Sequence, residues 1–563
     1  MSQRQREETR PRGRAERRAE QRQVRKTART VFGFRDGWIA CGLVLLAWVH
    51  RIAFIRSNRD WSWPYTIFYE GDSETFFNYA RAILRGLPYD SGIPFHPPGF
   101  AYVLAFLHAF VGAGGPSERV PYFAVKVLVA LIGSVSIGLL YLLAKPYVGR
   151  TVALLGSLLG LYSFGLYVLH VAPVTEATYQ TLLLLTLLYW TRRFEHPLAA
   201  PVESHRKTAG PAGAVLLGLM LGALALIRAE AMLVGLILGG VGLIGWFLRR
   251  REEPVETRGL AGLRPWALVA AGWILAVAPW TVRNAVLLSA TNERLAGQIA
   301  EPLPTFVPLT LYAPLNLALA NNPQADGTFS RAYLSSASDS PVLDLKDPQH
   351  LRFILHGDRM ARDWALENPG AAGRLLLRKW WGFFDSWRLG WTQWNLPGGL
   401  DGVRRPVDVF VPASSAALWI GPPLAILGLV LCLGTAGGPR RWALLVLLMT
   451  TVGLVATGLF FGYVRQGLLY LPLWLTLPAA ALTAIARRFT HRGEGWRLAP
   501  AEETDPSPRL LKVLGGAALV LLLVEGWGSR TDRNYDATGT TIPGSKYLNR
   551  DEMMWLKVKP PED

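Results

Sequence analysis

Runs of roughly 20 apolar residues, the length that crosses a lipid bilayer, recur along most of this chain. Short loops rich in Lys and Arg separate them. Backbone polar groups in hydrocarbon must be satisfied within their own segment, so such runs form helices. Together with 51% hydrophobic residues, this pattern predicts an all-α polytopic membrane protein.

The apolar runs predict about 11 transmembrane helices with a cytoplasmic N-terminus. In chain order the predicted spans are 38–55, 122–143, 152–171, 175–191, 212–228, 230–248, 265–281, 413–432, 442–460, 466–485 and 511–527. This arrangement leaves Lys145, Arg150 and the arginines of 249–251 cytoplasmic, as the positive-inside rule requires. The run at 99–111 is too short to cross, so we expect a surface-lying or re-entrant helix there.

The spans divide the chain into parts. These are a basic cytoplasmic tail at 1–37, a transmembrane module at 38–281 with a first external loop at 56–120, a large external loop at 282–410, C-terminal transmembrane helices at 411–527 and an external tail at 528–563. Within the large loop, Leu351–Leu366 and Ala371–Trp387 show helical spacing of apolar residues. We therefore predict two amphipathic helices there, separated by Asn368-Pro-Gly370.

The formal net charge of +18 sits mainly in the N-terminal tail and the short loops. Because membrane orientation explains this charge, we expect no nucleic-acid partner. The tail at 1–35 has no apolar core, so we expect no cleavable signal there. It is typical of a disordered cytoplasmic tail, with an arm for anionic lipid or a partner as the alternative. Cys41 and Cys432 both lie in apolar runs and predict neither a disulfide nor a metal site.

Three carboxylates crowd the first external loop, in Tyr69-Glu-Gly-Asp-Ser-Glu74. A short amphipathic helix follows this acidic motif, and Phe95-His-Pro-Pro-Gly99 comes after the helix. A structural alternative is that Asp72 or Ser73 caps the helix, with Glu74 stabilised in its first turn. His96 likewise has the alternative of marking a rigid turn before two prolines.

Further polar residues fall at the predicted external ends of spans, so we expect them to converge on one membrane face. Together with the acidic motif they are Glu70, Asp72, Glu74, His96, Glu176, Arg228, Glu230, Arg283, Asn284 and Arg465. Ionisable groups near the membrane are costly and are often functional. The structural alternatives are a satisfied turn for Glu176, an ion pair between Arg228 and Glu230, and snorkelling for the other arginines.

Glycosyl transfer from a polyprenyl-phosphate-linked sugar suits acids and arginines at a lipid–water boundary. Arginine donates forked hydrogen bonds to phosphate, and fixed positive charge stabilises the leaving phosphate. One carboxylate suffices as general base on the acceptor hydroxyl, giving inversion in a single step. We predict Asp72 as this base, assisted by Glu74 or Glu70, and Arg283, Arg465 and Arg228 as donor-phosphate ligands.

At these residues the chain resembles the GT-C membrane glycosyltransferases, in particular the protein O-mannosyltransferases, the lipid A aminoarabinose transferases and their bacterial relatives. The matching segments, within residues 38–395, are the acidic motif, Gly86–Tyr89, His96–Pro98, Pro173–Glu176, Gly218–Glu230, Pro279–Asn284 and Asn321–Gly327. The resemblance implies a polyprenyl-phosphate-sugar donor, an external active site at a bacterial-type plasma membrane and a catalytic aspartate at Asp72. It also implies acceptor, sugar or metal-assisting roles for His96, Glu176, Asn284, Asn321 and Asn322.

The chain departs from the family pattern in two places. Ser73 separates Asp72 from Glu74 where relatives often carry adjacent Asp-Glu, and the late Arg-Tyr motif appears only as Tyr463-Val-Arg465. No cofactor is required by the motifs. A divalent metal on Asp72, Glu74, His96 and Glu176 remains an open alternative, because hard-ion ligand spacing is not diagnostic.

The sequence does not identify the acceptor, which could be a glycan, a lipid or a protein. Three other functions are alternatives to the transferase, and each would have a distinguishing feature. A polymerase or ligase would use a lipid-diphosphate donor, and a transporter or lipid flippase would use charges and broken helices near the midplane. A scaffold presenting the large loop to a partner leaves the acidic motif unexplained. We expect most charges at one external face, which favours the transferase.

Overall fold

A computed structural model describes residues 34–57, 70–87, 90, 93–112, 122–201, 209–252, 263–330, 332–337, 343–391, 415–462 and 464–490. Within these ranges every extended regular element is a helix, and no β-strand occurs. The helices are α3 (Phe34–Ser57), α4 (Glu70–Leu84), α5 (Gly99–Phe110), α6 (Tyr122–Tyr162), α7 (Phe164–Val171), α8 (Thr175–Arg193), α9 (Pro211–Ile227), α10 (Ala231–Glu252), α11 (Arg264–Arg294), α12 (Ala313–Ala320), α13 (Ala332–Ser335), α14 (Pro348–Glu367), α15 (Pro369–Trp391), α16 (Ser415–Gly434), α17 (Gly438–Leu459), α18 (Val464–Leu468) and α19 (Leu471–Thr490). The all-α prediction is confirmed.

The chain is a multi-pass membrane protein. Among the described residues, five helices are long and apolar enough to cross a bilayer, and the bent pair α7–α8 would make a sixth. The five are Arg35–Ile55, Phe123–Tyr162, Ala231–Leu248, Arg264–Arg294 and Gly438–Leu459, where Phe123–Tyr162 counts once although Gly149 divides it. Four further apolar helices, α5, α9, α16 and α19, offer only shorter apolar stretches. The predicted number of 11 spans is not established, and the span predicted at 511–527 lies outside the described residues.

Helix α6 is two antiparallel segments rather than one long rod. Gly149 interrupts it with φ 82° and ψ 167°, a backbone conformation that favours glycine. Past this turn the chain folds back, and a methyl group placed on Gly160 would come 3.3 Å from Cδ1 of Ile137. The turn falls in the loop predicted between 122–143 and 152–171.

Two predicted spans are broken in the structure, which corrects the sequence-based boundaries. The run at 152–171 is interrupted at Ser163, between α6 and α7, and the run at 466–485 is interrupted between α18 and α19. A break inside a membrane is tolerated when side chains satisfy the carbonyls that it releases. Arg51 Nη1 donates to the Leu161 carbonyl at 3.3 Å, and Gln180 Nε2 donates to the Leu468 and Leu469 carbonyls at 3.0 and 3.3 Å.

Helix α11 also differs from its prediction, because it continues from the predicted end at 281 to Arg294. The added residues contain no proline or glycine to stop the helix. The segment packs Leu288 into a second apolar core built with α12 and α14, separate from the core of the bundle. The large loop therefore begins on a rigid extension of a membrane helix.

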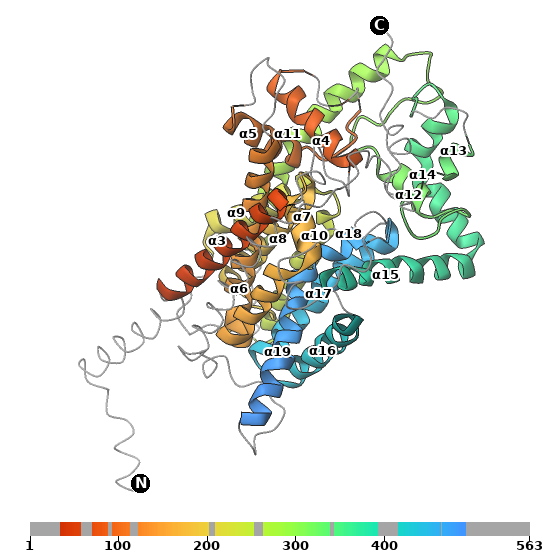
Figure 1. Cartoon of the computed structure of the whole chain (residues 1–563). Helices are drawn as coiled ribbons and strands as arrows, with labels where there is room; N and C mark the ends of the chain where they lie inside the picture. Colours follow the sequence, from red (N-terminus) through yellow and green to blue (C-terminus); the bar gives the residue numbers. More distant parts are fainter. Residues whose placement is uncertain are drawn as a thin grey trace, which may run out of the picture.

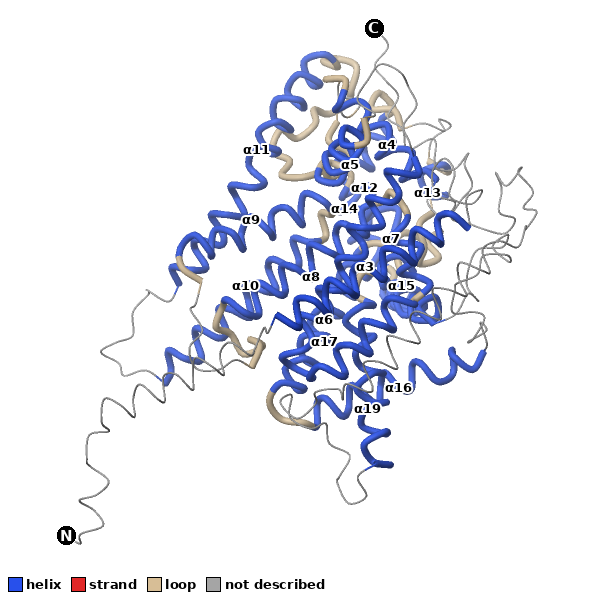
Figure 2. The backbone as a smooth tube through the Cα atoms, turned by 60° about the vertical axis from the view of Figure 1, so that its left-hand side comes forward, coloured by secondary structure: helices blue, strands red, loops and turns tan. Residues whose placement is uncertain are grey.

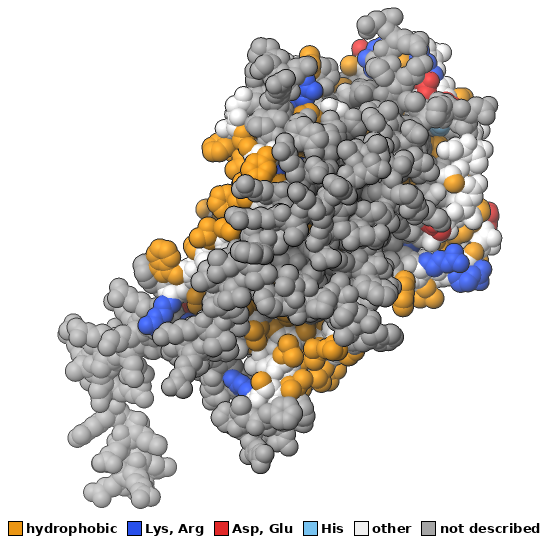
Figure 3. Space-filling model, in the orientation of Figure 1, with side chains coloured by type: hydrophobic (Ala, Val, Ile, Leu, Met, Phe, Trp, Pro, Cys, Tyr) orange, Lys and Arg blue, Asp and Glu red, His pale blue; other side chains and the backbone are white. Residues whose placement is uncertain are grey.

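The helices form a bundle with a layer at one end. Figures 1 and 2 show α6, α8 and α17 running side by side, while α4, α5, α12 and α14 gather at the end away from the start of α3. In Figure 3, hydrophobic side chains gather along the flank where Figure 1 places α3 and α5. Trp38, Leu45, Phe106 and Phe110 are exposed on these two helices, as expected for a surface that faces lipid.

Three predicted juxtamembrane helices are present. Helix α5 occupies the short apolar run at 99–111, and α14 and α15 occupy the two amphipathic segments of the large loop. Asp347 caps α14, since its carboxylate accepts the backbone N–H groups of Gln349 and His350. Asn368 ends α14, and Pro369 begins α15 immediately after it.

Candidate functional site

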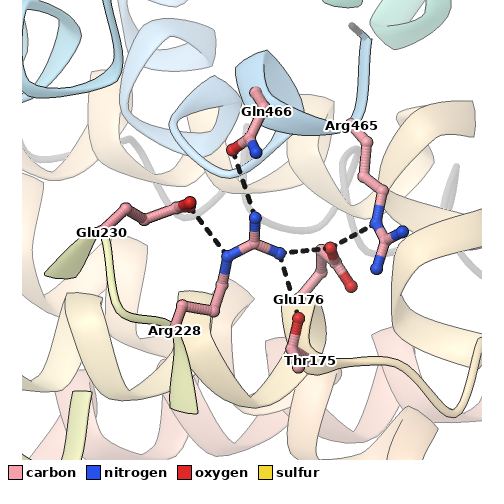
Figure 4. A network of polar contacts seen from close by, with 6 residues as sticks. All are labelled: Thr175, Glu176, Arg228, Glu230, Arg465 and Gln466. Atoms are coloured by element: carbon pink, nitrogen blue, oxygen red, sulfur yellow. Dashed lines mark hydrogen bonds and ion pairs between the residues drawn. The ribbon is translucent and has the colours of Figure 1, made fainter. Parts of the chain in front are cut away.

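Three helix breaks meet at one buried polar network, drawn in Figure 4. The network residues are Thr175 and Glu176 at the start of α8, Arg228 and Glu230 between α9 and α10, and Arg465 and Gln466 on α18. Pro173 precedes α8 and cannot donate a backbone hydrogen bond, which favours a break there. Residues that the sequence scatters over nearly 300 positions therefore contact one another.

Arg228 is the centre of this network. Its Nε donates to Glu230 Oε1 at 2.8 Å, its Nη1 to Thr175 Oγ1 at 3.0 Å and its Nη2 to Gln466 Oε1 at 3.3 Å. The same Nη1 also donates to Glu176 Oε1. Arg465 Nε donates to that oxygen from the opposite side. One carboxylate oxygen thus joins two guanidinium groups from helices far apart in sequence.

The network is buried and its formal charges balance. The Glu176 side chain is fully buried, and those of Arg465, Arg228 and Glu230 are 9%, 11% and 15% exposed. Two arginines face two glutamates, so no net charge is removed from water. The arrangement holds three helix ends rigidly. To bind an anion, an arginine would have to exchange one of its present partners.

The His96 motif packs directly against this part of the bundle. A Cβ on Gly99 would lie 2.8 Å from the Leu226 carbonyl oxygen, so only glycine lets α5 begin this close to the end of α9. Arg228 follows two residues later in the chain. The motif and the network are therefore neighbours, although the sequence separates them by more than 100 residues.

His96 lies in an aromatic cluster that joins α4 to the large loop. Its Nδ1 shares a hydrogen bond of 3.1 Å with the Tyr79 hydroxyl of α4. Its ring also contacts those of Phe76, Phe95 and Tyr312 at centroid distances of 4.9–5.7 Å. These contacts make His96 a link between α4 and the segment that leads into α12.

The acidic motif opens α4. The helix begins at Glu70, so Asp72 and Glu74 lie in its first turns rather than before it. The alternative that Asp72 or Ser73 caps the helix is therefore wrong in this structure. Negative charge in the first turn of a helix is stabilised by the helix dipole. The side chains of Glu70, Asp72 and Glu74 are outside the described residues. Asp72 precedes Phe76, whose ring contacts His96, by one helical turn.

Arg283 has a different partner from the other predicted arginines. Its two terminal nitrogens hold Asp90 in a bidentate ion pair at 2.7 and 3.0 Å, and its guanidinium lies 4.5 Å from the Trp280 ring centroid. Burial raises the pKa of Asp90 above its usual value, and the ion pair with Arg283 opposes that shift. The Arg283 side chain remains 30% exposed. Asp90 directly follows the Gly86–Tyr89 segment, but no sequence pattern predicted it as the partner of Arg283.

The three predicted asparagines make structural contacts. Asn284 Nδ2 donates to the Val307 and Leu309 carbonyls at 2.9 and 3.1 Å, which ties α11 to the large loop. Asn322 donates to the Ala318 and Leu319 carbonyls at the end of α12. Asn321 donates to the Leu459 carbonyl of α17 and accepts from Lys379 at 2.7 Å. None of these hydrogen bonds joins an asparagine to the Glu176 network.

No group of three or more His, Cys, Asp or Glu side chains that could hold a metal ion occurs in the part of the chain that the structure describes. Of the four residues predicted as a metal set, Glu176 contacts arginines and His96 contacts aromatic rings. The two remaining carboxylates, Asp72 and Glu74, have side chains outside the described residues.

A second buried series of hydrogen bonds, which was not predicted from the sequence, runs from α3 to α18. Arg51 Nε donates to His170 Nδ1 at 3.0 Å, so the imidazole carries its proton on Nε2. That Nε2–H donates to Gln180 Oε1 at 2.7 Å, and the Gln180 amide donates to the Leu468 carbonyl. Gly133 makes room, because a Cβ there would come 2.5 Å from the His170 ring. Charged and polar residues inside apolar runs were the available signal.

Comparisons with known proteins give no close relative. No family model matches the chain, and no curated protein matches it. Among solved structures it is similar to the oligosaccharyltransferase AglB of Archaeoglobus fulgidus in complex with an inhibitory peptide and a dolichol-phosphate. That match has 12% identity, a TM-score of 0.38 and coverage of 94% of this chain and 61% of that one.

Two further structures of the Archaeoglobus fulgidus oligosaccharyltransferase give similar values. The apo form matches with 12% identity, a TM-score of 0.39 and coverage of 95% of this chain and 61% of the other. The form tethered to an acceptor peptide containing the NVT sequon matches with 14% identity, a TM-score of 0.36 and coverage of 92% of this chain and 59% of the other. The chain thus spans about three fifths of the chains it matches. Similarity at this level is too low to assign a function.

Proposed function

We propose that this chain is an integral membrane glycosyltransferase of the GT-C class. It transfers a sugar from a polyprenyl-phosphate-linked donor to a glycan, lipid or protein acceptor at the external face of a plasma membrane. The observation that carries the proposal is the close packing of the His96 motif against the end of α9, beside the buried network of Glu176, Arg228 and Arg465. This brings two sequence motifs of the proposed class to one end of the bundle.

In the proposed reaction, Asp72 removes the proton of the acceptor hydroxyl while that oxygen attacks the anomeric carbon of the sugar. The bond between the anomeric carbon and the phosphate oxygen breaks, and polyprenyl phosphate leaves with the electron pair. The configuration at the anomeric carbon is inverted. Glu74 or Glu70 orients the acceptor or raises the basicity of Asp72.

The arginines differ in how they would serve a donor phosphate. Arg283 is the most exposed of the three, and its two terminal nitrogens already hold a carboxylate, which has similar geometry to phosphate. Arg465 is buried beside Glu176. Arg228 is engaged by four side chains, so its proposed role is to hold Glu176 and Gln466 in place. His96, Asn284, Asn321 and Asn322 then act by positioning α4, α11 and α12.

The deciding experiment measures sugar transfer and release of polyprenyl phosphate by the reconstituted full chain. The donors are a panel of polyprenyl-phosphate sugars, each with acceptor extract and with or without chelator. We expect turnover with one donor and a loss of about 10²–10⁴-fold in Asp72→Asn, the usual contribution of a general base. Asp363→Asn is the matched control, since Asp363 lies on α14 with its side chain 54% exposed.

Other outcomes point to other functions. Normal turnover by folded Asp72→Asn would refute the proposed base. Inactivity of the wild type with every monophosphate donor, but turnover with a polyprenyl-diphosphate donor, would indicate a polymerase or ligase. Movement of a lipid or solute without sugar transfer would indicate a transporter or flippase. Loss of activity with chelator, restored by a divalent cation, would establish a metal requirement.

A further inference from the structure

Helix α15 has one buried face and one exposed face with a distinct composition. Leu375, Lys379, Phe383 and Ser386 recur at helical spacing and are buried. The opposite face is exposed, with Trp381 at 72% and Leu377 at 63%, and is completed by Phe384, Arg374 and Arg378. This exposed stripe therefore combines three large apolar side chains with two cations.

The buried face fixes the depth of α15 relative to the membrane. Trp380 Nε1 donates to the Leu454 carbonyl and Lys379 Nζ to the Gly458 carbonyl, both at 3.0 Å. Both carbonyls belong to the last turns of α17, one of the helices that can cross a bilayer. Helix α15 therefore lies at the level where a membrane helix ends, which is the depth of lipid headgroups.

Close backbone contacts hold α15 at that depth. A Cβ on Gly462 would lie 2.2 Å from the Lys379 carbonyl oxygen, and one on Gly467 would lie 2.1 Å from the Phe383 carbonyl oxygen. One glycine between α17 and α18 and another within α18 thus allow α15 to pack directly on the chain. The helix cannot rotate its exposed stripe inward without losing these contacts.

The two arginines of the stripe have no acidic partner among the residues that the structure describes. Figure 3 shows basic side chains beside hydrophobic ones at the edge of the molecule where Figure 1 places α15. Val455 and Leu459, also exposed, continue the apolar surface along the end of α17. A partner of this surface must offer both apolar groups and negative charge, which is the chemistry of an anionic phospholipid.

We propose that the exposed stripe of α15 is a binding surface for anionic phospholipid. Arg374 and Arg378 bind the headgroup phosphates, while Leu377, Trp381 and Phe384 enter the acyl boundary. Guanidinium suits this role because it stays charged and donates paired hydrogen bonds to phosphate. The proposal depends on the placement of α15 and is independent of the glycosyltransferase function.

The test measures which lipids surround α15 in vesicles containing the full chain. The probe is a fluorophore on Leu377→Cys in a Cys41→Ser background, since Cys41 is exposed and Cys432 is buried. Quenching is compared between nitroxide-labelled phosphatidylglycerol and nitroxide-labelled phosphatidylcholine at equal mole fraction. We expect phosphatidylglycerol to quench more strongly, with a preference of about fivefold for each arginine near the surface.

Two variants separate charge recognition from general destabilisation. Arg374→Gln with Arg378→Gln should abolish the preference while leaving quenching by the two lipids equal and substantial. Arg352→Gln with Arg359→Gln removes the same charge from exposed positions on α14 and should leave the preference intact. Equal quenching in the wild type would overturn the proposal. So would weak quenching by both lipids together with cross-linking of Leu377→Cys between two copies of the chain.

Discussion

Arg465 of α18 donates its Nε–H to the fully buried carboxylate of Glu176 on α8, 289 positions earlier in the chain. The same carboxylate oxygen accepts from Arg228, which follows α9. Three separate helix ends are therefore held by one acidic side chain. Because the charges balance only as a set, the loss of Glu176 affects all three ends at once.

We expect Glu176→Gln to lower the free energy of unfolding by about 3–5 kcal/mol. The substitution removes the negative charge that both Arg228 and Arg465 contact. The measurement is the unfolding midpoint of the purified chain in detergent. The control is Asp363→Asn, which removes an ion pair with Arg362 whose side chains are 54% and 64% exposed. That variant should change stability by no more than about 0.5 kcal/mol. Equal midpoints for both variants would mean that the buried pairs contribute little.

Sequence patterns predict which residues belong to this network better than they predict which of these residues pair with each other. Glu176, Arg228 and Arg465 stand out because an ionisable residue at the end of an apolar run is costly unless it is paired. Their pairing depends on how the helices pack, which no local pattern records. Asp90 is the clearest example, because it forms a bidentate pair with Arg283 across 193 positions and nothing local to either residue indicates that pairing.

Hydropathy also failed at the breaks inside predicted spans. The residues around Ser163 and between α18 and α19 are as apolar as a continuous helix would require. The breaks exist because Arg51 and Gln180 satisfy the released carbonyls from other helices. In contrast, α14 and α15 were predicted closely, since their spacing and the Asn368-Pro-Gly370 boundary are local signals.

His170 and Gln180 share a buried hydrogen bond, so we expect their contributions to the stability of the protein to be coupled. Gln180→Leu leaves the His170 Nε2–H and the Leu468 carbonyl without their partner, at a cost of about 1–3 kcal/mol. His170→Phe removes the same interaction from the other side. A double-mutant cycle on the unfolding midpoint should give a coupling energy of about 0.5–3 kcal/mol.

The matched control for this cycle is Gln324→Leu combined with His170→Phe. The Gln324 amide donates to the Ser336 hydroxyl in an exposed contact of the large loop. Gln324 is far in sequence from His170 and Gln180 and shares no hydrogen-bond partner with them. We expect the effects of that pair to add within about 0.5 kcal/mol. Additive effects for His170 and Gln180 would show that the buried hydrogen bonds act independently.

Because Lys379 is buried, we expect the stability of the protein to depend on pH. Its side chain is 1% exposed, and burial lowers the pKa of its ammonium from 10.5 to about 7. Between those values the unfolded chain binds more protons than the folded chain, so stability rises with pH from about 7 towards 10.5. Below pH 7 both states are protonated, and the cost of the buried charge is fully present.

The test follows the unfolding midpoint of wild type and Lys379→Met between pH 6 and pH 9. Between pH 7 and pH 9 the wild type should gain up to about 2–3 kcal/mol from this group, a gain that the methionine variant lacks. Lys346→Met is the control, because Lys346 is exposed on the same large loop and should leave the pH profile of the wild type unchanged. Parallel profiles for wild type and Lys379→Met would contradict the assignment.

Helices α9 and α11 pack through glycines, so we expect a larger residue at their contact to destabilise the protein. A Cβ on Gly218 would come 2.0 Å from the Val269 carbonyl oxygen, and one on Gly272 would come 2.3 Å from that of Val215. The two helices therefore touch through their backbones, and a methyl group must push them apart. Because α9 leads directly to Arg228, separation of α9 from α11 would also move the buried network.

We expect Gly218→Ala to lower the free energy of unfolding by about 1–3 kcal/mol, the usual range for overpacking. Gly235→Ala on α10 is the matched control, because a Cβ there meets no atom within 4 Å. Alanine forms helix more readily than glycine, so this variant should be unchanged or more stable by up to about 1 kcal/mol. Thermal unfolding of both variants in the same detergent compares them directly. If Gly218→Ala were as stable as Gly235→Ala, the backbone contact that positions Arg228 would be looser than this structure has it.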